Sequence, residues 1–487
     1  MRKRTLPILP VLLAALVLAV RPAHAQSTPT DPKDQEIQLL KTEINQLEHR
    51  VDTLEGLDQK VKVIDRKLEV QQEAQHQREL EMPVVKVSDE GFSLASPNHD
   101  YNLNLSGIIQ ADGRFFASGA DKNVGSTFFL NRVRPILTGT VAKYYNFNIT
   151  PDFGQGRVTL QDAYINMTYW DYASLRAGKF KAPLDLERLQ TDRDLAFSER
   201  SEIQNLVPNR DTGFSLHGRL LDGRLFYDAA LMNGVANNTA ADTTDLDTND
   251  GKDFVGRIFA TPFELSEKWW LKGLGFGFAG SYGDERGSTI SIYRTYGMST
   301  WFTYNKGVTA SGLRARIEPQ LYYYWRSFGL LAEYAQDEQS LNRFITVGKA
   351  PTARLINRTD TFTNTGYVVQ GSYLLTGEDA SYGWVKPRHP FDPRNGFWGA
   401  WEVAARISNV AAQTRQFQLG FANPSVSAKS ATEWSLGINW YLTPNVKWQF
   451  DYANTFFNGG AGTTAVPTDR PNESVFESQL QISFGGS

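Results

Sequence analysis

The chain contains no cysteine and only six histidines among its 487 residues. Without cysteine the fold can hold no disulfide, and thiolate metal sites and thiol nucleophiles are excluded. The few histidines leave little material for a histidine-based metal centre or hydrolase. We therefore expect no catalytic residue, no bound metal and no cofactor.

Long apolar segments are also missing beyond the extreme N-terminus, and the mean hydropathy is −0.39. A transmembrane helix needs about 20 consecutive apolar residues, so a bundle of such helices is excluded. The one apolar run, 6–20, follows Arg2, Lys3 and Arg4 and precedes the small-x-small sequence 23–25. This order predicts a signal peptide over 1–25 and export of the mature chain. An uncleaved anchor is the disfavoured alternative, because the run is short for a membrane span.

A helical pattern follows a polar linker at 26–33. Residues 34–82 carry apolar side chains at alternating three- and four-residue steps, which predicts a coiled coil. The phase shifts by three residues at Gly56, which overwinds a coiled coil locally without ending it. A single amphipathic helix lying on another surface is the alternative. The apolar positions are Ile37, Leu40, Ile44, Leu47, Val51, Leu54, Leu57, Val61, Ile64 and Leu68.

Beyond a second linker at 83–98, the hydrophobic period changes to two and stays there to the end of the chain. In 433–440 the aromatic and aliphatic residues share one face, and the polar residues share the other. The segments 162–169 and 477–484 repeat this pattern. Strands of about 9–11 residues with one apolar and one polar face are typical of transmembrane β-barrels. We predict an all-β domain at 99–487, an antiparallel barrel of roughly 16 strands.

A soluble β-sandwich would also alternate, but two further features favour the membrane barrel. Large aromatic residues such as Trp401, Trp440 and Trp448 gather near the ends of the apolar face, as interfacial girdles require. Connectors also come in two lengths: 221–224 and 442–446 are tight turns, whereas 235–253 and 458–473 are long and polar. Short turns on one side and long loops on the other are the outer-membrane arrangement.

Several arginines lie in the phase that a barrel turns toward its lumen. Arg132 and Arg134 share one strand face, and Arg314 and Arg316 repeat the arrangement. An arginine facing lipid costs about 2–4 kcal/mol at the bilayer midplane, so these side chains should line the pore and attract anions. Arg176 and Arg406 occupy equivalent positions. Alternatively, these arginines pair with lumen carboxylates such as Asp162, Glu318 and Glu402 and give no strong selectivity.

A charge-dense stretch between residues 179 and 219 interrupts the strand pattern. Its composition favours a segment at about 182–212 that folds into the lumen and narrows it, with an outward loop as the alternative. Here the sequence resembles the phosphate-selective porins O and P of Gram-negative outer membranes. The resemblance runs through FLNRVR at 129–134, TPDFG at 150–154, DAYI at 162–165, LRAGKFK at 175–181, FSER at 197–200, the segments 319–334, 372–378 and 399–408, and INWYLTPN at 438–445.

The resemblance implies a trimeric 16-stranded barrel with an inward third loop and an arginine-lined path to a central anion site. Carried over by position, Arg132, Arg188 and Arg200 would bind the anion, with Asp162 as a lumen acid. Two departures weaken the match for phosphate. Asn131 stands where a second arginine is expected, and Thr191-Asp192 replaces a pair of hydroxyls. The barrel would also end on an aromatic residue, whereas Phe484 is followed by residues 485–487.

We therefore expect an outer-membrane porin of a Gram-negative bacterium, a passive channel for small anions, among them phosphate or related oxyanions. Its predicted partners are a homotrimer, outer-membrane lipid and lipopolysaccharide, with no nucleic acid, and the N-terminal segment would lie in the periplasm. The alternative is a general or weakly selective porin whose coiled coil acts as a structural tether. A hydrolase would depend on His217 alone, and a plugged iron transporter would need a folded plug larger than 26–95.

Overall fold

The computed structural model describes residues 32–89, 91–119, 124–238, 250–287, 290–347 and 354–485. The predicted signal peptide, most of the linker at 26–33 and the last two residues lie outside these ranges. The chain divides into two units, Met1–Leu80 and Glu81–Ser487, and each is considered by itself.

The first unit contains a single helix, α1 (Pro32–Glu81), which runs unbroken through Gly56. Its apolar seam has no cover within the chain: Ile37 is 49% exposed and Leu54 is 63% exposed. Among the described helices none is both long and apolar enough to cross a bilayer. An uncovered apolar seam is unfavourable in water. The helix therefore has the kind of surface that one helix of a coiled coil presents to its partner helices.

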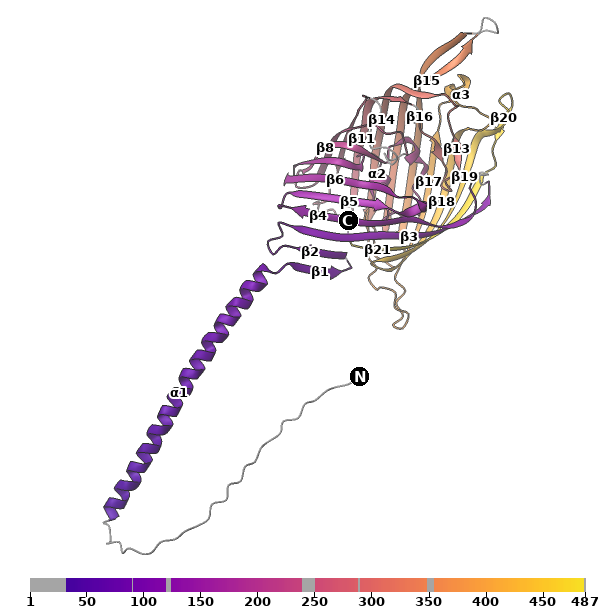
Figure 1. The fold of residues 1–487 in the computed structure, drawn as a ribbon. Coiled ribbons are helices and arrows are strands. Elements are labelled where there is room, and N and C mark those ends of the chain that lie inside the picture. The colour runs from indigo at the N-terminus through magenta and orange to yellow at the C-terminus, as the bar shows by residue number, and fades with distance from the viewer. Residues whose placement is uncertain are drawn as a thin grey trace. The chain divides into compact units, whose positions relative to one another are not determined.

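The second unit is a closed antiparallel barrel of 16 strands, as the alternation predicts (Figure 1). Each strand pairs with the next along the chain, and the last pairs with the first through Gln481 and Gln110. The barrel strands are β3 (Asn102–Ser118), β4 (Thr127–Val141), β5 (Tyr145–Asp152), β6 (Thr159–Trp170), β7 (Ala173–Lys181), β8 (Arg210–Leu220), β9 (Leu225–Met232), β10 (Asp253–Ala260), β11 (Leu274–Gly287), β14 (Thr309–Trp325), β15 (Phe328–Val347), β16 (Arg354–Leu374), β17 (Ala400–Ala411), β18 (Ala428–Thr443), β19 (Val446–Gly462) and β21 (Glu473–Phe484).

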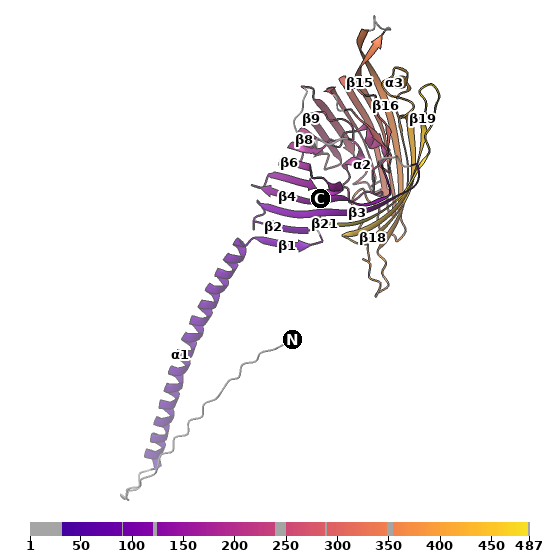
Figure 2. The same cartoon turned by 45° about the vertical axis from the view of Figure 1, so that its right-hand side comes forward.

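Short elements occupy the connectors. Figure 2 shows α2 inside the ring of strands. These elements are η1 (Gly154–Gly156), α2 (Leu186–Leu189), η2 (Glu202–Leu206), β12 (Tyr293–Arg294), β13 (Thr300–Phe302), α3 (Thr414–Gln418) and β20 (Pro467–Asp469).

The segment 83–98 is not the linker that its composition suggests. It forms a hairpin of β1 (Val84–Ser88) and β2 (Gly91–Ala95), and β2 pairs with β3 from Phe92↔Leu105 to Ala95↔Asn102. The closing strand β21 reaches β3 only as far as Gly107. The hairpin therefore supplies hydrogen-bond partners to the part of β3 that β21 leaves uncovered, and an unpaired strand edge is costly.

The wall is polar inside and apolar outside. Along β18, Glu433 and Asn439 are fully buried, whereas Leu436 is 54% exposed and Ile438 is 45% exposed. This inversion of the usual soluble pattern is what a lipid-facing barrel requires. Outside, Trp401, Trp440 and Trp448 stack in a row, with ring centroids 4.9 and 6.4 Å apart, and form part of an aromatic girdle.

The connectors fall on two sides, as the sequence predicts. On one side most are short, such as 142–144, 171–172 and 444–445, and on the other side they are long. The connector 375–399, on the short side, is an exception. Its Tyr382 donates a hydrogen bond to the carbonyl of Leu186, and Gln190 donates to the carbonyl of Tyr382 at 2.7 Å. It therefore supports the long connector that enters the lumen.

Candidate functional site

The connector between β7 and β8, residues 182–209, folds into the lumen and is called here the constriction loop. Leu186, Leu206 and Val207 are fully buried and pack in one cluster with Leu331 and Phe362 of the barrel wall. Burial of this kind stabilises the loop by about 1.5–3 kcal/mol for each large apolar side chain. The outward loop considered from the sequence is therefore wrong, and the loop holds a fixed position in the pore.

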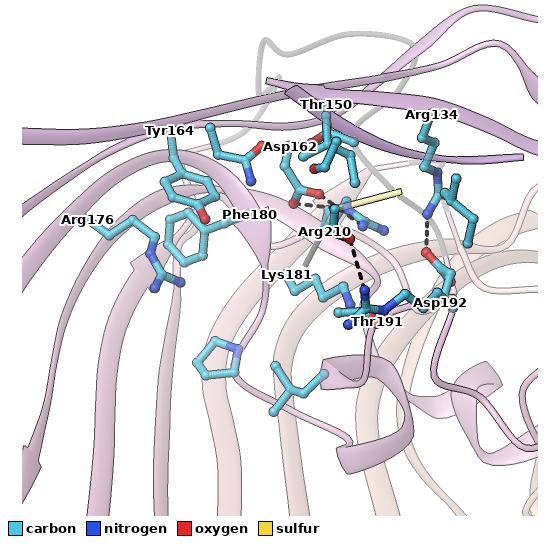
Figure 3. A pocket seen from close by; sticks show the side chains of 18 of the residues that line it. Arg134, Thr150, Asp162, Tyr164, Arg176, Phe180, Lys181, Thr191, Asp192 and Arg210 are labelled. Carbon is cyan, nitrogen blue, oxygen red and sulfur yellow. Dashed lines mark hydrogen bonds and ion pairs between the residues drawn. The ribbon is translucent and has the colours of Figure 1, made fainter. Parts of the chain in front are cut away.

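Three arginines converge on one carboxylate of this loop. Asp192 lies 3.4 Å from Nε of Arg132 and 2.6 Å from Nη1 of Arg200. It also pairs with Nη1 of Arg134, as Figure 3 shows. Arg132 and Arg134 come from β4, and Arg200 comes from the loop itself. We call these four residues the arginine cradle.

Charge balance in the cradle favours the ionised aspartate. Burial by itself would raise the pKa of Asp192, but the guanidiniums of Arg134, Arg200 and Arg132 hold that pKa well below its usual value. The carboxylate thus occupies the position that three converging cations would offer to a free anion. The sequence predicts that Asp192 repels a permeant anion. The structure shows that its carboxylate lies where the three guanidiniums would bind such an anion.

Asn131 faces the lumen together with its neighbour Arg132, although strict alternation would send one of them outward. The register against β3 skips Asn131, since Gln110 pairs with Arg132 and Ala111 pairs with Leu130. Such a bulge turns two consecutive side chains inward. Asn131 donates to Asp112 at 2.7 Å and to Glu199 at 3.1 Å. It therefore contacts carboxylates beside the cradle and not Asp192.

Arg188 lies outside the cradle contacts. It follows the N-cap of α2, where the Asp185 side chain accepts from the Arg188 backbone N–H at 3.0 Å. Its guanidinium donates to the neutral oxygens of Gln204 at 3.1 Å and Asn238 at 3.3 Å. The three cations predicted to meet at one site are thus split: Arg132 and Arg200 meet at Asp192, and Arg188 does not.

The more distant arginines of the prediction are held by carboxylates of the wall. Arg314 contacts Asp253 at 2.9 Å and Glu285 at 2.8 Å, and Arg316 contacts Asp253 at 3.0 Å. Their partners differ from the acids proposed on sequence grounds, but the pairing itself agrees with that alternative. These arginines brace the barrel wall.

Arg406 ties the constriction loop to the wall. It pairs with Glu187 of the loop at 3.0 Å and with Glu433 of β18 at 2.9 Å. The two remaining polar candidates are also engaged. Thr191 donates to Asp194 at 2.6 Å, and Asp162 receives Arg210 through both of its oxygens.

A cavity of about 420 Å³ lies beside the cradle (Figure 3). Its lining contains six basic and three acidic side chains. The lining joins strand residues of the wall to Asp192 of the loop and Tyr382 of the connector 375–399. The charged residues are Arg134, Arg176, Lys181, Arg193, Arg210, Arg257, Asp162, Asp192 and Asp228.

Of these groups, Lys181 and Arg210 belong to the charge-dense stretch noted in the sequence but were not proposed as site residues, and Arg257 was missed. Sequence reasoning also missed Arg114, which contacts Glu199 at 3.1 Å and Glu477 at 3.0 Å. Arg114 could have been found, because it follows Gln110 and Asp112 at two-residue steps on the polar face of β3. Lys181 and Arg210 could not be assigned to the site from the sequence, because they lie where the strand pattern gives way to the loop.

One acidic cluster has the spacing of a metal site. Asp112, Glu199 and Glu477 offer oxygens within 4.8 Å of one another. Arg114 already bridges two of these carboxylates, and a cation that competes with a metal argues for an ion-pair network. His217 contacts Asn166 at 2.9 Å and Arg176 at 3.4 Å. Neither contact is a nucleophile that this histidine could activate as a general base.

Comparisons with known proteins agree with this geometry. A family model described as phosphate-selective porin O and P matches residues 103–484. Porin O of Pseudomonas aeruginosa is 25% identical over 385 residues, which cover 73% of this chain and 83% of that protein.

Among solved structures, OmpT, an outer membrane protein of Vibrio cholerae, is similar with a TM-score of 0.48, at 11% identity, over 79% of this chain and 98% of that chain. The outer membrane channel DcaP of Acinetobacter baumannii is similar with a TM-score of 0.47, at 10% identity, over 79% of this chain and 97% of that chain.

Proposed function

This chain belongs to the phosphate-selective porin O and P family and is an outer-membrane porin, and we propose on that premise that its lumen passes small anions through a constriction at the arginine cradle. The observation that carries the proposal is the convergence of Arg132, Arg134 and Arg200 on Asp192. Three guanidiniums aimed at one point form a site for a charged oxygen group. The excess of basic side chains around the adjoining cavity favours anions over cations.

Among the proposed permeants, phosphate makes the greatest demand on the site. Phosphate carries one to two negative charges at neutral pH, so it needs several charge-assisted donors at once. We assign these donors to Arg132, Arg134 and Arg200. Arg188, which donates to Gln204 and Asn238, is a more distant cation on the loop. Asp192 competes for all three donors, and Asn131 adds no charge. Phosphate should therefore pass readily and bind weakly.

Other functions have less support. The family is one of channels and not of enzymes, and a general porin with only a tethering helix is not favoured, because the cradle is a built charge site. Since α1 exposes an apolar seam that contains isoleucines, it can associate with more than one copy. We propose a homotrimer in outer-membrane lipid and lipopolysaccharide, with α1 in the periplasm.

The proposal is tested by phosphate block of the chloride current through the purified porin in a planar bilayer. The unaltered channel should show weak block. Asn131→Arg combined with Asp192→Ser adds a cation and removes the competing carboxylate, so block should strengthen by at least tenfold in concentration, the value of one charge-assisted hydrogen bond of about 1.5–3 kcal/mol. Arg200→Ala should abolish the block that exists.

Arg415→Ala is the matched control, because Arg415 is an arginine of the described chain that lies exposed on α3. It should leave phosphate block unchanged. Strong block in the unaltered channel that is indifferent to Arg200→Ala would show that the anion site lies elsewhere.

A further inference from the structure

The cavity beside the arginine cradle is larger than a small inorganic anion needs. Its volume of about 420 Å³ equals roughly 14 water molecules at their share of liquid volume, about 30 Å³ each. Cavities of about 300–1,000 Å³ are the sites that bury small organic ligands. A phosphate ion in this space would leave most of the wall in contact with water alone.

Among the described residues, three of the cavity's six cations form no close ion pair, although Asp228 of the lining lies opposite Arg257 in the pairing of β9 with β10. Arg134 and Arg210 are paired with Asp192 and Asp162, and Arg193 is paired with its neighbour Asp194. Within the described ranges, the ion pairs include none to Arg176, Lys181 or Arg257.

Aromatic rings hold two of these cations in place of carboxylates. The Arg176 guanidinium lies 5.0 Å from the ring centre of Tyr164 and 5.2 Å from that of Phe180. The Arg257 guanidinium lies 5.6 Å from the ring centre of Phe226. A guanidinium stacked on a ring keeps its N–H donors in its own plane and free for another partner.

The donors of these two arginines are incompletely used. Nε of Arg176 is buried and has no hydrogen-bond partner among the described residues, and Nη2 lies 3.4 Å from His217. Arg257 donates through Nε to Gln320 at 2.9 Å. Figure 3 shows Arg176, Tyr164 and Phe180 close together on the wall of the cavity. A carboxylate that entered the cavity here could accept hydrogen bonds from guanidinium N–H groups that lie beside aromatic rings.

We propose that this cavity binds aromatic carboxylates on their way through the pore. The carboxylate would take hydrogen bonds from Arg176, with Arg257 adding positive charge. The flat ring would pack on the partly exposed rings of Tyr164 and Phe226, since aromatic contacts add about 0.5–1.5 kcal/mol beyond buried area. The inference rests on the proposed anion-channel function and names a substrate class for it.

The test compares benzoate, cyclohexanecarboxylate and acetate as blockers of chloride current through the purified porin in a planar bilayer. The three anions carry the same charge, and they differ in the size and flatness of the body. Benzoate should block at a concentration at least tenfold below that of acetate, with cyclohexanecarboxylate between them. Equal block by benzoate and acetate would overturn the aromatic site.

Two variants locate the block. Arg176→Gln keeps a polar but shorter side chain and removes the charge, and it should weaken benzoate block by about tenfold. It should weaken phosphate block much less than benzoate block, because the cradle does not include Arg176. Arg219→Gln, at an exposed arginine at the end of β8, is the matched control. Benzoate block that survives Arg176→Gln intact would contradict the assignment.

The reversal potential measured on the same channels separates this inference from its premise. Anion preference with equal benzoate and acetate block means that the channel function stands and the aromatic site is wrong. Cation preference means that the proposed function itself is wrong.

Discussion

Asp192 has two effects that oppose each other. It contacts three guanidiniums that would otherwise repel one another across a buried space, where Asp152 also pairs with Arg134, and it fills the position a permeant anion would take. Removing one partner of a buried charge pair leaves the other charge unpaired, which is strongly destabilising. The residue that weakens anion binding is therefore one that holds the constriction together.

We predict that Asp192→Asn, a change of nearly equal volume, lowers the free energy of unfolding by about 3 kcal/mol. Because the folded pKa of Asp192 lies below its unfolded value of about 3.9, its stabilisation is present above that pH and disappears as the pH falls through the folded pKa. Urea titration of the refolded barrel near neutral pH measures the loss. Asp194→Asn, on the same loop, is the comparison, and equal stability of Asp192→Asn and the unaltered protein would contradict the ion-pair account.

The sequence predicted which arginines face the lumen, but not which residues they contact. The two-residue period places Arg132, Arg134 and Arg316 inside the barrel, because an arginine toward lipid is costly. Nothing in the period shows that Arg316 meets Asp253, since β14 and β10 meet their common neighbour β11 in a register that only the fold defines. The sequence did not show that Asn131 faces the lumen beside Arg132. That orientation depends on the bulge in β4, which no local sequence pattern indicated.

At the scale of elements, the hairpin β1–β2 moves the start of the β-structure from residue 99, the predicted start, to Val84. Its two strands are five residues each, so their apolar–polar alternation is too short to distinguish them from a linker. Pairing with β3 gives them their structure, and this long-range contact was not visible in the sequence. The helix and the long strands were predictable because their periods persist over many residues.

Truncation of the mature chain tests this boundary. Removal of 26–81, with the signal retained, should leave insertion and single-channel conductance unchanged, because the barrel satisfies its own backbone hydrogen bonds. Removal of 26–95 also strips β2 from β3 and exposes backbone groups at 102–105, so the yield of folded barrel should fall. Heat-modifiable migration on gels measures folded yield. Equal yields from both truncations would show that the hairpin is dispensable.

For the whole molecule, an inside-out distribution of polarity explains both the fold and the function. Apolar residues such as Leu436 and Ile438 face outward, and charged residues such as Glu433 and Arg406 are buried in the lumen. The near balance of acidic and basic residues in the sequence gives no selectivity by itself. Selectivity comes from placement, because the constriction loop brings cations from the wall and from itself to one level of the pore.

The most direct measurement of this account is the reversal potential of the purified porin in a planar bilayer under a potassium chloride gradient. The account predicts a reversal potential displaced toward the chloride equilibrium potential, because basic groups exceed acidic groups around the cavity at the constriction. Asp192→Asn should displace it further in the same direction. A reversal potential on the potassium side in the unaltered channel would contradict the central claim that this pore prefers anions.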